Sequence, residues 1–237
     1  MAWKENMKWN KRFDYINCSR SEVQGSRTYD IQGNALPSVT SILSGTKDQE
    51  FLKKWKQRVG HEEADRIKNY SSKRGTAMHK FIEKYLLGEP FEDLTKIGQE
   101  AKKMAQTIVE IGLLPLQEIW GNEVTLWYPD LYAGSTDLVG IYNGKETLID
   151  FKQANRPKQR DWIEDYFLQV GAYAMAHDHL YDTRIEQAII MICTPDCYYH
   201  DFTIKGLEFR QKKYDFMERL NKYHESRKES VLQSTGA

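Results

Sequence analysis

Two aspartates and a lysine stand among strand-forming residues in the stretch AGSTDLVGIYNGKETLIDFKQ, residues 133–153. The pair Asn143-Gly144 lies in its middle. Asn-Gly between apolar runs predicts a two-residue hairpin turn, because both residues tolerate positive φ. A turn there sets Asp137 directly opposite Asp150. Like charges in opposed positions destabilise a sheet, so a shared proton, a basic side chain or a divalent cation must offset their repulsion.

Lys152 follows Asp150 by two residues and therefore points to the same face of the strand. Two carboxylates and a lysine on one face can hold Mg²⁺ or Mn²⁺ with positions left open for water. A salt-bridged polar patch on a solvated sheet is the alternative. The apolar neighbours favour a site inside the domain over that patch: Leu138, Val139, Leu148, Ile149 and Phe151.

The elements that must position these residues follow from hydrophobic periodicity. We expect helices over residues 50–59, 61–87, 96–112, 160–179 and 206–228, and a short helix through Leu43 capped by Ser38 or Thr40. We expect strands over residues 27–31, 36–39, 119–128, 132–142, 145–152 and 188–194. This order predicts an α/β fold with a mixed sheet flanked by helices: its first strands antiparallel, its last joined by a helical crossover.

Four motifs follow one another along this pattern: His79 on a helix, Gly134-x-x-Asp137, Asp150-x-Lys152, and Gln169-x-x-x-Tyr173. In order and spacing the set resembles the PD-(D/E)XK nuclease superfamily. It is most similar to the RecB-type branch, and within it to the mitochondrial genome maintenance exonucleases and their phage relatives. The resemblance covers about residues 35–195 and implies a restriction-endonuclease-like core.

The resemblance implies a metal-dependent DNA exonuclease that hydrolyses phosphodiester bonds in single-stranded DNA or flapped ends, in DNA replication, recombination or repair. Its pattern makes four groups ligands of Mg²⁺ or Mn²⁺: His79, Asp137, Asp150 and the backbone carbonyl of Phe151. Lys152 would position the attacking water or stabilise the phosphate. Its ammonium lies beside two carboxylates and should stay protonated, which favours electrostatic help over general-base catalysis.

Three further residues share helix faces with the motif residues. Gln169 and Tyr173, four apart on one helix, would orient DNA or brace the site, although a packed tyrosine beside a rim glutamine is a close alternative. Glu83, four residues after His79, would hold that histidine or contact the metal through water. A plain surface pair with a lysine explains Glu83 about equally well.

The charge distribution suggests where DNA would bind. The 237-residue chain has 34 Lys and Arg against 34 Asp and Glu, yet residues 1–80 hold 16 basic and 9 acidic residues. Such asymmetry suggests a polyanion-binding region, with a solvated charged surface as the plain alternative. Phosphates would be contacted by Arg74, Thr136, Arg156, Lys158 and Arg160. Unpaired bases would stack on one or two of Trp55, Trp162, Tyr166 and Phe167.

We expect one nuclease domain over residues 1–237: a mainly helical, basic region (1–95), a catalytic core (96–228) and a flexible tail (229–237). No apolar run reaches the roughly 18 residues of a membrane span. The three cysteines provide neither a disulfide framework nor the four thiolates of an iron–sulfur site. No secretory or transit signal is recognisable, so we expect the cytoplasm of a bacterium or of a phage-infected cell. One alternative is a structure-specific or single-strand endonuclease of the same superfamily. Another is a non-catalytic DNA-binding module, but such a module has no need of opposed acids, which destabilise the sheet.

Overall fold

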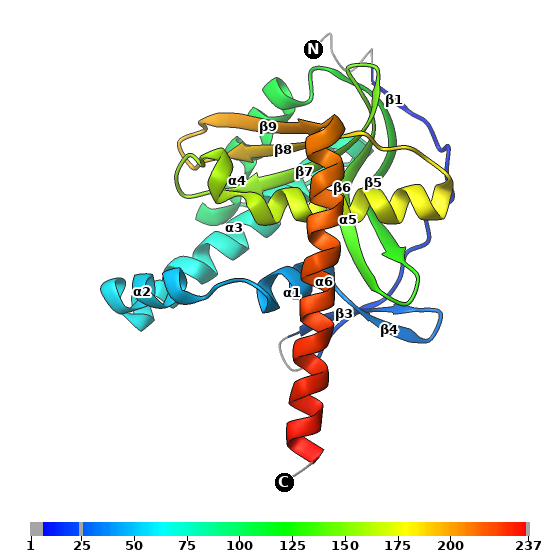
Figure 1. Ribbon diagram of the computed structural model, residues 1–237. Helices are drawn as coiled ribbons and strands as arrows, with labels where there is room; N and C mark the ends of the chain where they lie inside the picture. The colour runs from blue at the N-terminus through cyan, green and yellow to red at the C-terminus, as the bar shows by residue number, and fades with distance from the viewer. Residues whose placement is uncertain (1–6, 24–25, 236–237) are drawn as a thin grey trace.

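The computed structural model describes residues 7–23 and 26–235. Within these residues a mixed sheet of six strands runs in the order β1-β5-β6-β7-β8-β9, with helices on both faces (Figure 1). Its strands are β1 (Lys8–Trp9), β5 (Leu116–Tyr128), β6 (Tyr132–Tyr142), β7 (Lys145–Gln153), β8 (Gln187–Cys193) and β9 (Tyr199–Lys205). The predicted mixed sheet flanked by helices is confirmed.

The hairpin of β6 and β7 has the register that its turn predicts. Asn143 and Gly144 both have positive φ, 49° and 71°, and the pairing runs from Tyr142 with Lys145 to Leu138 with Ile149. β5 and β6 are also antiparallel, whereas β7 and β8 are parallel. The parallel pair needs a crossover, and α5 (Glu164–Tyr181) provides it, as expected.

Two hydrophobic clusters lie on opposite faces of this sheet, because successive strand residues alternate between faces. Leu148 belongs to the cluster under α5 and α6 (Gly206–Thr235), whereas Ile149 belongs to the cluster under α3 (His61–Leu87) and α4 (Lys96–Thr107). The chain continues from α4 in a π-helical turn, Ile108–Gly112, and a 3₁₀ turn, Arg160–Trp162, precedes α5. Each helix layer therefore brings its own side chains to the ends of the central strands.

A second, antiparallel sheet of three strands precedes the helices: β2 (Arg20–Val23), β3 (Ser26–Ile31) and β4 (Asn34–Pro37). Ser38 joins it to the large sheet by pairing with Ala133 of β6. The Ser38 hydroxyl also caps α1 (Val39–Gly45), where it accepts a hydrogen bond of 3.0 Å from the backbone N–H of Ser41. The sequence predicted the β3–β4 hairpin of this sheet but not β2. Residues 1–95 were expected to be mainly helical, whereas in the described part of this region helices begin only at Val39.

Beyond α1, α2 (Glu50–Val59) and the first half of α3 stand out from the body of the molecule (Figure 1). At the other end of the chain, α6 continues to Thr235 and so covers most of the segment predicted as a tail from 229. No glycine or proline lies between Gly206 and Gly236, which explains why the helix continues past its predicted end at residue 228. None of the helices in the described residues is both long and apolar enough to cross a membrane.

Candidate active site

A cleft of about 640 Å³ lies between α3, the β6–β7 hairpin, α5 and the small sheet. Five of the residues that the four motifs single out for chemistry line it: His79, Asp137, Lys152, Gln169 and Tyr173. Asp150 lies directly behind them and is 1% exposed. Residues that are up to 94 positions apart in the sequence therefore meet at one place, as the motif set predicted.

The acids lie where the two hairpin strands separate. The backbone pairing of β6 with β7 ends at Leu138 and Ile149, one residue before the opposed aspartates. There the carboxylate of Asp137 acts as the hydrogen-bond acceptor in place of a backbone carbonyl: its Oδ2 accepts a hydrogen bond of 2.6 Å from the N–H of Phe151. Asp137 is 8% exposed. Burial would raise its pKa, but His79, Lys152 and the N–H of Phe151 together outweigh burial and lower it.

Asp150 is held from two sides. Its Oδ2 lies 2.5 Å from Nζ of Lys152, and its Oδ1 accepts a hydrogen bond of 3.1 Å from Nε2 of Gln169. Gln169 also donates to the hydroxyl of Tyr173 at 3.3 Å. Burial, and the charge of Asp137 after it, raise the pKa of Asp150 to about 6 even though Lys152 opposes them. Gln169 therefore braces an acid, which is one of its two predicted roles.

The glycine of the Gly134-x-x-Asp137 motif has a packing role. A Cβ atom at Gly134 would lie 2.4 Å from Cε1 of Tyr173, far inside contact distance. The bare backbone thus lets the tyrosine ring lie flat against β6, with its hydroxyl beside Gln169. Tyr173 is 2% exposed, so its contribution to the site is a packed support.

His79 reaches the acids from α3, on the opposite face of the sheet from α5. Its Nδ1 lies 3.3 Å from Oδ1 of Asp137 and 3.7 Å from Oε1 of Glu123. Burial would lower the pKa of His79, but the Asp137 and Glu123 carboxylates outweigh burial and raise it to about 10. The imidazole thus sits in a strongly negative environment.

Lys152 has the protonation that was expected. Burial would lower its pKa, yet the charges of Asp150 and Asp137 outweigh burial and raise it. Its ammonium also lies 5.1 Å from the ring centroid of Tyr166, within the range of a cation–π contact. A lysine held in its charged form can stabilise negative charge, but it cannot accept a proton.

Glu123 is the acidic cleft residue that sequence reasoning missed. It lies in β5, and its carboxylate clusters with His79 and Asp137. Its φ is 54°, a conformation that glutamate rarely adopts. The signal was the Gly121-Asn122 pair inside an otherwise strand-like run, because a glycine within a strand often marks a bulge or a close approach.

Two of the residues predicted to contact DNA are buried. Thr136 has no exposed surface, since strand alternation turns it away from the face of Ser135 and Asp137. Arg74 is 4% exposed, and its guanidinium is bound to Gln153, Asn155 and Glu100. Direct DNA contacts by these two residues are therefore wrong predictions for this conformation.

The other three predicted DNA contacts follow β7, outside the cleft lining. Arg160 pairs with Glu208 at 2.5 Å and lies over the ring of Phe167. Lys158 is half-buried and Arg156 is exposed, so contacts of these two with DNA stay predictions. The cations that do line the cleft are Arg20 and Arg27 of the small sheet, Lys80 and Lys152.

Glu83 lines the cleft, but its carboxylate pairs with Lys80, 2.9 Å away on the same helix. This ion pair is the plainer of the two explanations considered for Glu83. Among the predicted stacking residues, Tyr166 lines the cleft, whereas Phe167 is 2% exposed and belongs to the core. Trp162 is 62% exposed and lies outside the cleft lining.

The donor set fits a divalent cation. His79, Glu123 and Asp137 each offer one ligand atom, all within 4.8 Å of one another. Oδ2 of Asp150 is buried without a hydrogen-bond partner in the described residues, because the nearby Lys152 contacts it outside hydrogen-bond geometry. One imidazole nitrogen and several carboxylate oxygens suit Mn²⁺ or Mg²⁺. A carbonyl ligand from Phe151 stays a prediction.

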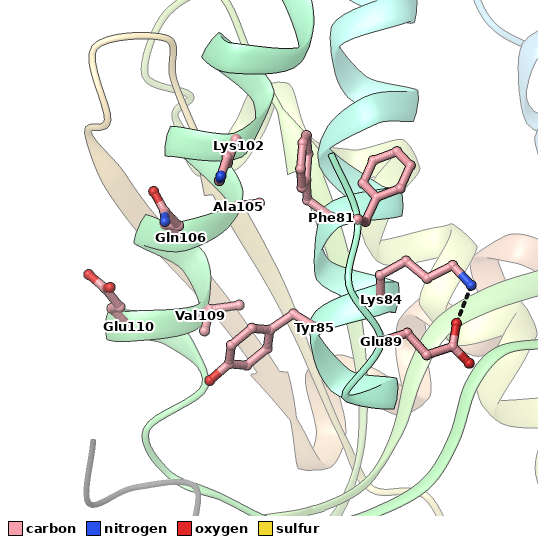
Figure 2. A pocket seen from close by; sticks show the side chains of 10 residues that line it. Phe81, Lys84, Tyr85, Glu89, Lys102, Ala105, Gln106, Val109 and Glu110 are labelled. Carbon is pink, nitrogen blue, oxygen red and sulfur yellow. Dashed lines mark hydrogen bonds and ion pairs between the residues drawn. The ribbon is translucent and has the colours of Figure 1, made fainter. Parts of the chain in front are cut away.

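A second pocket of about 220 Å³ lies between α3 and α4 (Figure 2). Phe81, Tyr85 and Val109 make it largely apolar, and the Lys84–Glu89 ion pair lies at its rim. It uses the side of α3 that faces α4, whereas His79 and Lys80 face the cleft. It contains none of the residues that the motifs single out, so the chemistry belongs to the cleft.

A mixed sheet flanked by helices, with Asp137, Asp150 and Lys152 at the open end of a hairpin, is the arrangement expected of the PD-(D/E)XK class. The chain is 33% identical over 180 residues to mitochondrial genome maintenance exonuclease 1 of Mus musculus, covering 70% of this chain and 52% of that protein. The Homo sapiens protein is also 33% identical, over 184 residues, covering 70% and 51%. The resemblance predicted from the motifs is confirmed, and the chain spans about half the length of these relatives.

The solved structures to which the chain is similar are more distant in sequence. A putative exonuclease from Eubacterium rectale has a TM-score of 0.46 at 10% identity, covering 65% of this chain and 68% of that chain. An alkaline exonuclease from Laribacter hongkongensis has a TM-score of 0.32 at 14% identity, covering 66% and 84%. No family model matches the chain.

Proposed function

We propose that the protein is a metal-dependent deoxyribonuclease, and specifically an exonuclease acting on single-stranded DNA or flapped ends in DNA replication, recombination or repair. One observation carries the proposal: His79, Asp137, Asp150 and Lys152 converge on one cleft from α3, β6 and β7. The similarity to two proteins named as exonucleases supports it. A cytoplasmic location in a bacterium or phage-infected cell stays a prediction.

The residues divide the work of phosphodiester hydrolysis. His79, Asp137 and Asp150 would hold Mg²⁺ or Mn²⁺, which when bound polarises the phosphate and lowers the pKa of a coordinated water. Asp137 is pre-positioned for this role, because the N–H of Phe151 fixes its Oδ2 while Oδ1 faces His79. Fixed ligands avoid the cost of ordering flexible carboxylates when the substrate arrives.

Lys152 would stabilise the charge that develops on the phosphate. Its raised pKa keeps the ammonium charged at neutral pH, and Asp150 fixes its position at 2.5 Å. Gln169 holds Asp150 in turn, and Tyr173 supports Gln169. Neither Gln169 nor Tyr173 is required to touch DNA in this assignment, so both act as positioning residues.

The small sheet offers the DNA backbone its binding surface. Arg20 and Arg27 point from neighbouring strands into the cleft, both are exposed, and no carboxylate in the described residues pairs with either of them. Cations free of such partners can bind phosphates without first breaking an ion pair. Tyr166, beside Lys152, offers a ring for stacking an unpaired base, which supports single-stranded substrates.

The direct test is incubation of the purified protein with end-labelled single-stranded DNA and Mg²⁺ or Mn²⁺. We expect degradation by the wild-type protein and loss of it in Asp150→Ala and Lys152→Ala, with unchanged circular dichroism spectra. DNA left intact by a folded wild-type protein would refute the proposed activity. Full activity in either folded variant would refute the assigned site.

A circular single-stranded substrate separates the proposal from its alternatives. An exonuclease leaves the circle intact and degrades the same DNA once it is linearised, whereas an endonuclease of the same superfamily cuts both. A non-catalytic DNA-binding module would retain both substrates in a gel-shift experiment and cleave neither. The three outcomes are distinct in one experiment.

A further inference from the structure

Glu123 stands opposite the central acid of the site. In the pairing of β5 with β6, Asn122 pairs with Leu138 and Val124 with Thr136. Glu123 therefore occupies the position across from Asp137. An acid in this place adds a like charge beside Asp137, which costs stability unless something positive lies between them.

The backbone at Glu123 adds a second cost. Its φ of 54° lies in the left-handed region, which is unfavourable for a residue with a Cβ atom. Glycine would adopt it without that cost. The register of β5 with β6 is unchanged across this residue, from Gly121 with Val139 to Val124 with Thr136. The conformation brings the carboxylate into the cleft, with Oε1 3.7 Å from Nδ1 of His79.

The two lysines of the cleft are paired with acids other than Glu123. Lys80 pairs with Glu83 at 2.9 Å, and Lys152 lies 2.5 Å from Asp150. His79 is the neighbour that Glu123 and Asp137 share. The imidazole and the two carboxylates thus bring three ligand atoms within 4.8 Å of one another, close enough to share one cation.

We propose that Glu123 is a direct ligand of the divalent cation, together with His79 and Asp137, and that this donor set favours Mn²⁺ over Mg²⁺. Mg²⁺ prefers an all-oxygen shell with several waters, whereas imidazole nitrogen is a better donor to transition metals. Asp150, whose Oδ1 accepts a hydrogen bond from Gln169, would complete the shell through its buried Oδ2, which has an ion-pair contact with Lys152 but no hydrogen bond in the described residues. The inference rests on the proposed function only in taking this cation to be the one used for hydrolysis.

The test is isothermal titration calorimetry of the metal-free full chain with MnCl₂ and with MgCl₂, in the absence of DNA. We expect Mn²⁺ to bind more tightly than Mg²⁺, and Glu123→Gln to weaken Mn²⁺ binding at least about tenfold. Glu83→Gln is the matched control: it removes the same charge from the same cleft, but from an acid paired with Lys80. It should change Mn²⁺ affinity less than about twofold.

A third variant separates ligation from folding. Glu123→Gly removes the carboxylate and relieves the left-handed backbone, so its melting temperature without metal should equal or exceed that of the wild type. Its Mn²⁺ affinity should nevertheless fall as in Glu123→Gln. Wild-type affinity in Glu123→Gln, or equal losses in the Glu83 and Glu123 variants, would overturn the inference. Because the readout is metal binding, a wild-type protein that binds Mn²⁺ through Glu123 but cuts no DNA would defeat only the proposed function.

Discussion

Replacing Gly134 with alanine should disable the site without changing any charged group. The added Cβ would lie 2.4 Å from Cε1 and 3.0 Å from the hydroxyl oxygen of Tyr173. Favourable contacts between carbon atoms lie near 3.5–4.0 Å, so ring or strand must move by about 1 Å. Tyr173 is packed and 2% exposed, which leaves the ring little free space.

The expected magnitude follows from the contacts of Tyr173. Overpacking of this kind costs about 1–3 kcal/mol in the free energy of unfolding. A shifted ring moves its hydroxyl away from Gln169, which in turn holds Asp150 at 3.1 Å. Loss of an outer-shell contact to a ligand typically costs 10–100-fold, so we expect kcat in Gly134→Ala to fall by about that factor.

The assay combines single-stranded DNA turnover at saturating substrate with urea unfolding, for Gly134→Ala, Tyr173→Ala and the double variant. If the clash with the ring is the cause, the alanine should add less than about 0.5 kcal/mol of destabilisation in the Tyr173→Ala background. An equal cost in both backgrounds would refute the clash. Wild-type kcat in a folded Gly134→Ala protein would refute the link to Asp150.

Three further predictions concern groups outside the metal site. His177 is buried between aromatic rings, and burial lowers its pKa from 6.5 to about 4. Between these two pKa values the unfolded chain binds a proton that the native state does not bind, so the free energy of unfolding should fall by about 3 kcal/mol as the pH drops from 7.5 to 4. In His177→Gln, urea unfolding should show a smaller decrease over this pH range. The same decrease in the variant and the wild type would contradict the role given to His177. The double variant Arg20→Ala/Arg27→Ala, made in an Asp150→Ala background, should bind single-stranded DNA more weakly and release about two fewer ions on binding. Arg184→Ala, at an exposed arginine, is the control. An equal effect of Arg184→Ala would show that the small sheet is not part of the DNA-binding surface. Arg74→Met should cost about 1.5–3 kcal/mol in unfolding free energy, because it removes the hydrogen bonds that Gln153, Asn155 and Glu100 accept from a buried guanidinium. The salt slope of DNA binding should stay constant, and a stable protein with a reduced slope would restore Arg74 as a DNA contact.

Much of the site could be predicted from the sequence because its signals are local. The Asn143-Gly144 turn fixes the hairpin register within a dozen residues, so the opposition of Asp137 and Asp150 needs no knowledge of the rest of the fold. Helical spacing likewise sets Gln169 beside Tyr173. These relations survive into the structure, where Gln169 bonds to both Asp150 and Tyr173.

The errors share one cause, which is that a side chain's type does not reveal its partners. Arg74 suited a phosphate contact, but folding brings Glu100 of α4 and Gln153 of β7 to its guanidinium. No local sequence pattern singled out Arg20 and Arg27 as cleft residues, because their position depends on where the small sheet packs against the cleft.

The sequence by itself therefore determined the chemistry of the site and its order along the chain, since turn type, strand alternation and helix periodicity act over short distances. Only the tertiary structure decided which charges stay free and which are neutralised by partners. It alone also showed Glu123 turned into the site, because that depends on the left-handed backbone at this residue and on the approach of His79 from α3. Contacts between segments far apart in the chain are set by packing of the whole core, and no local pattern encodes them.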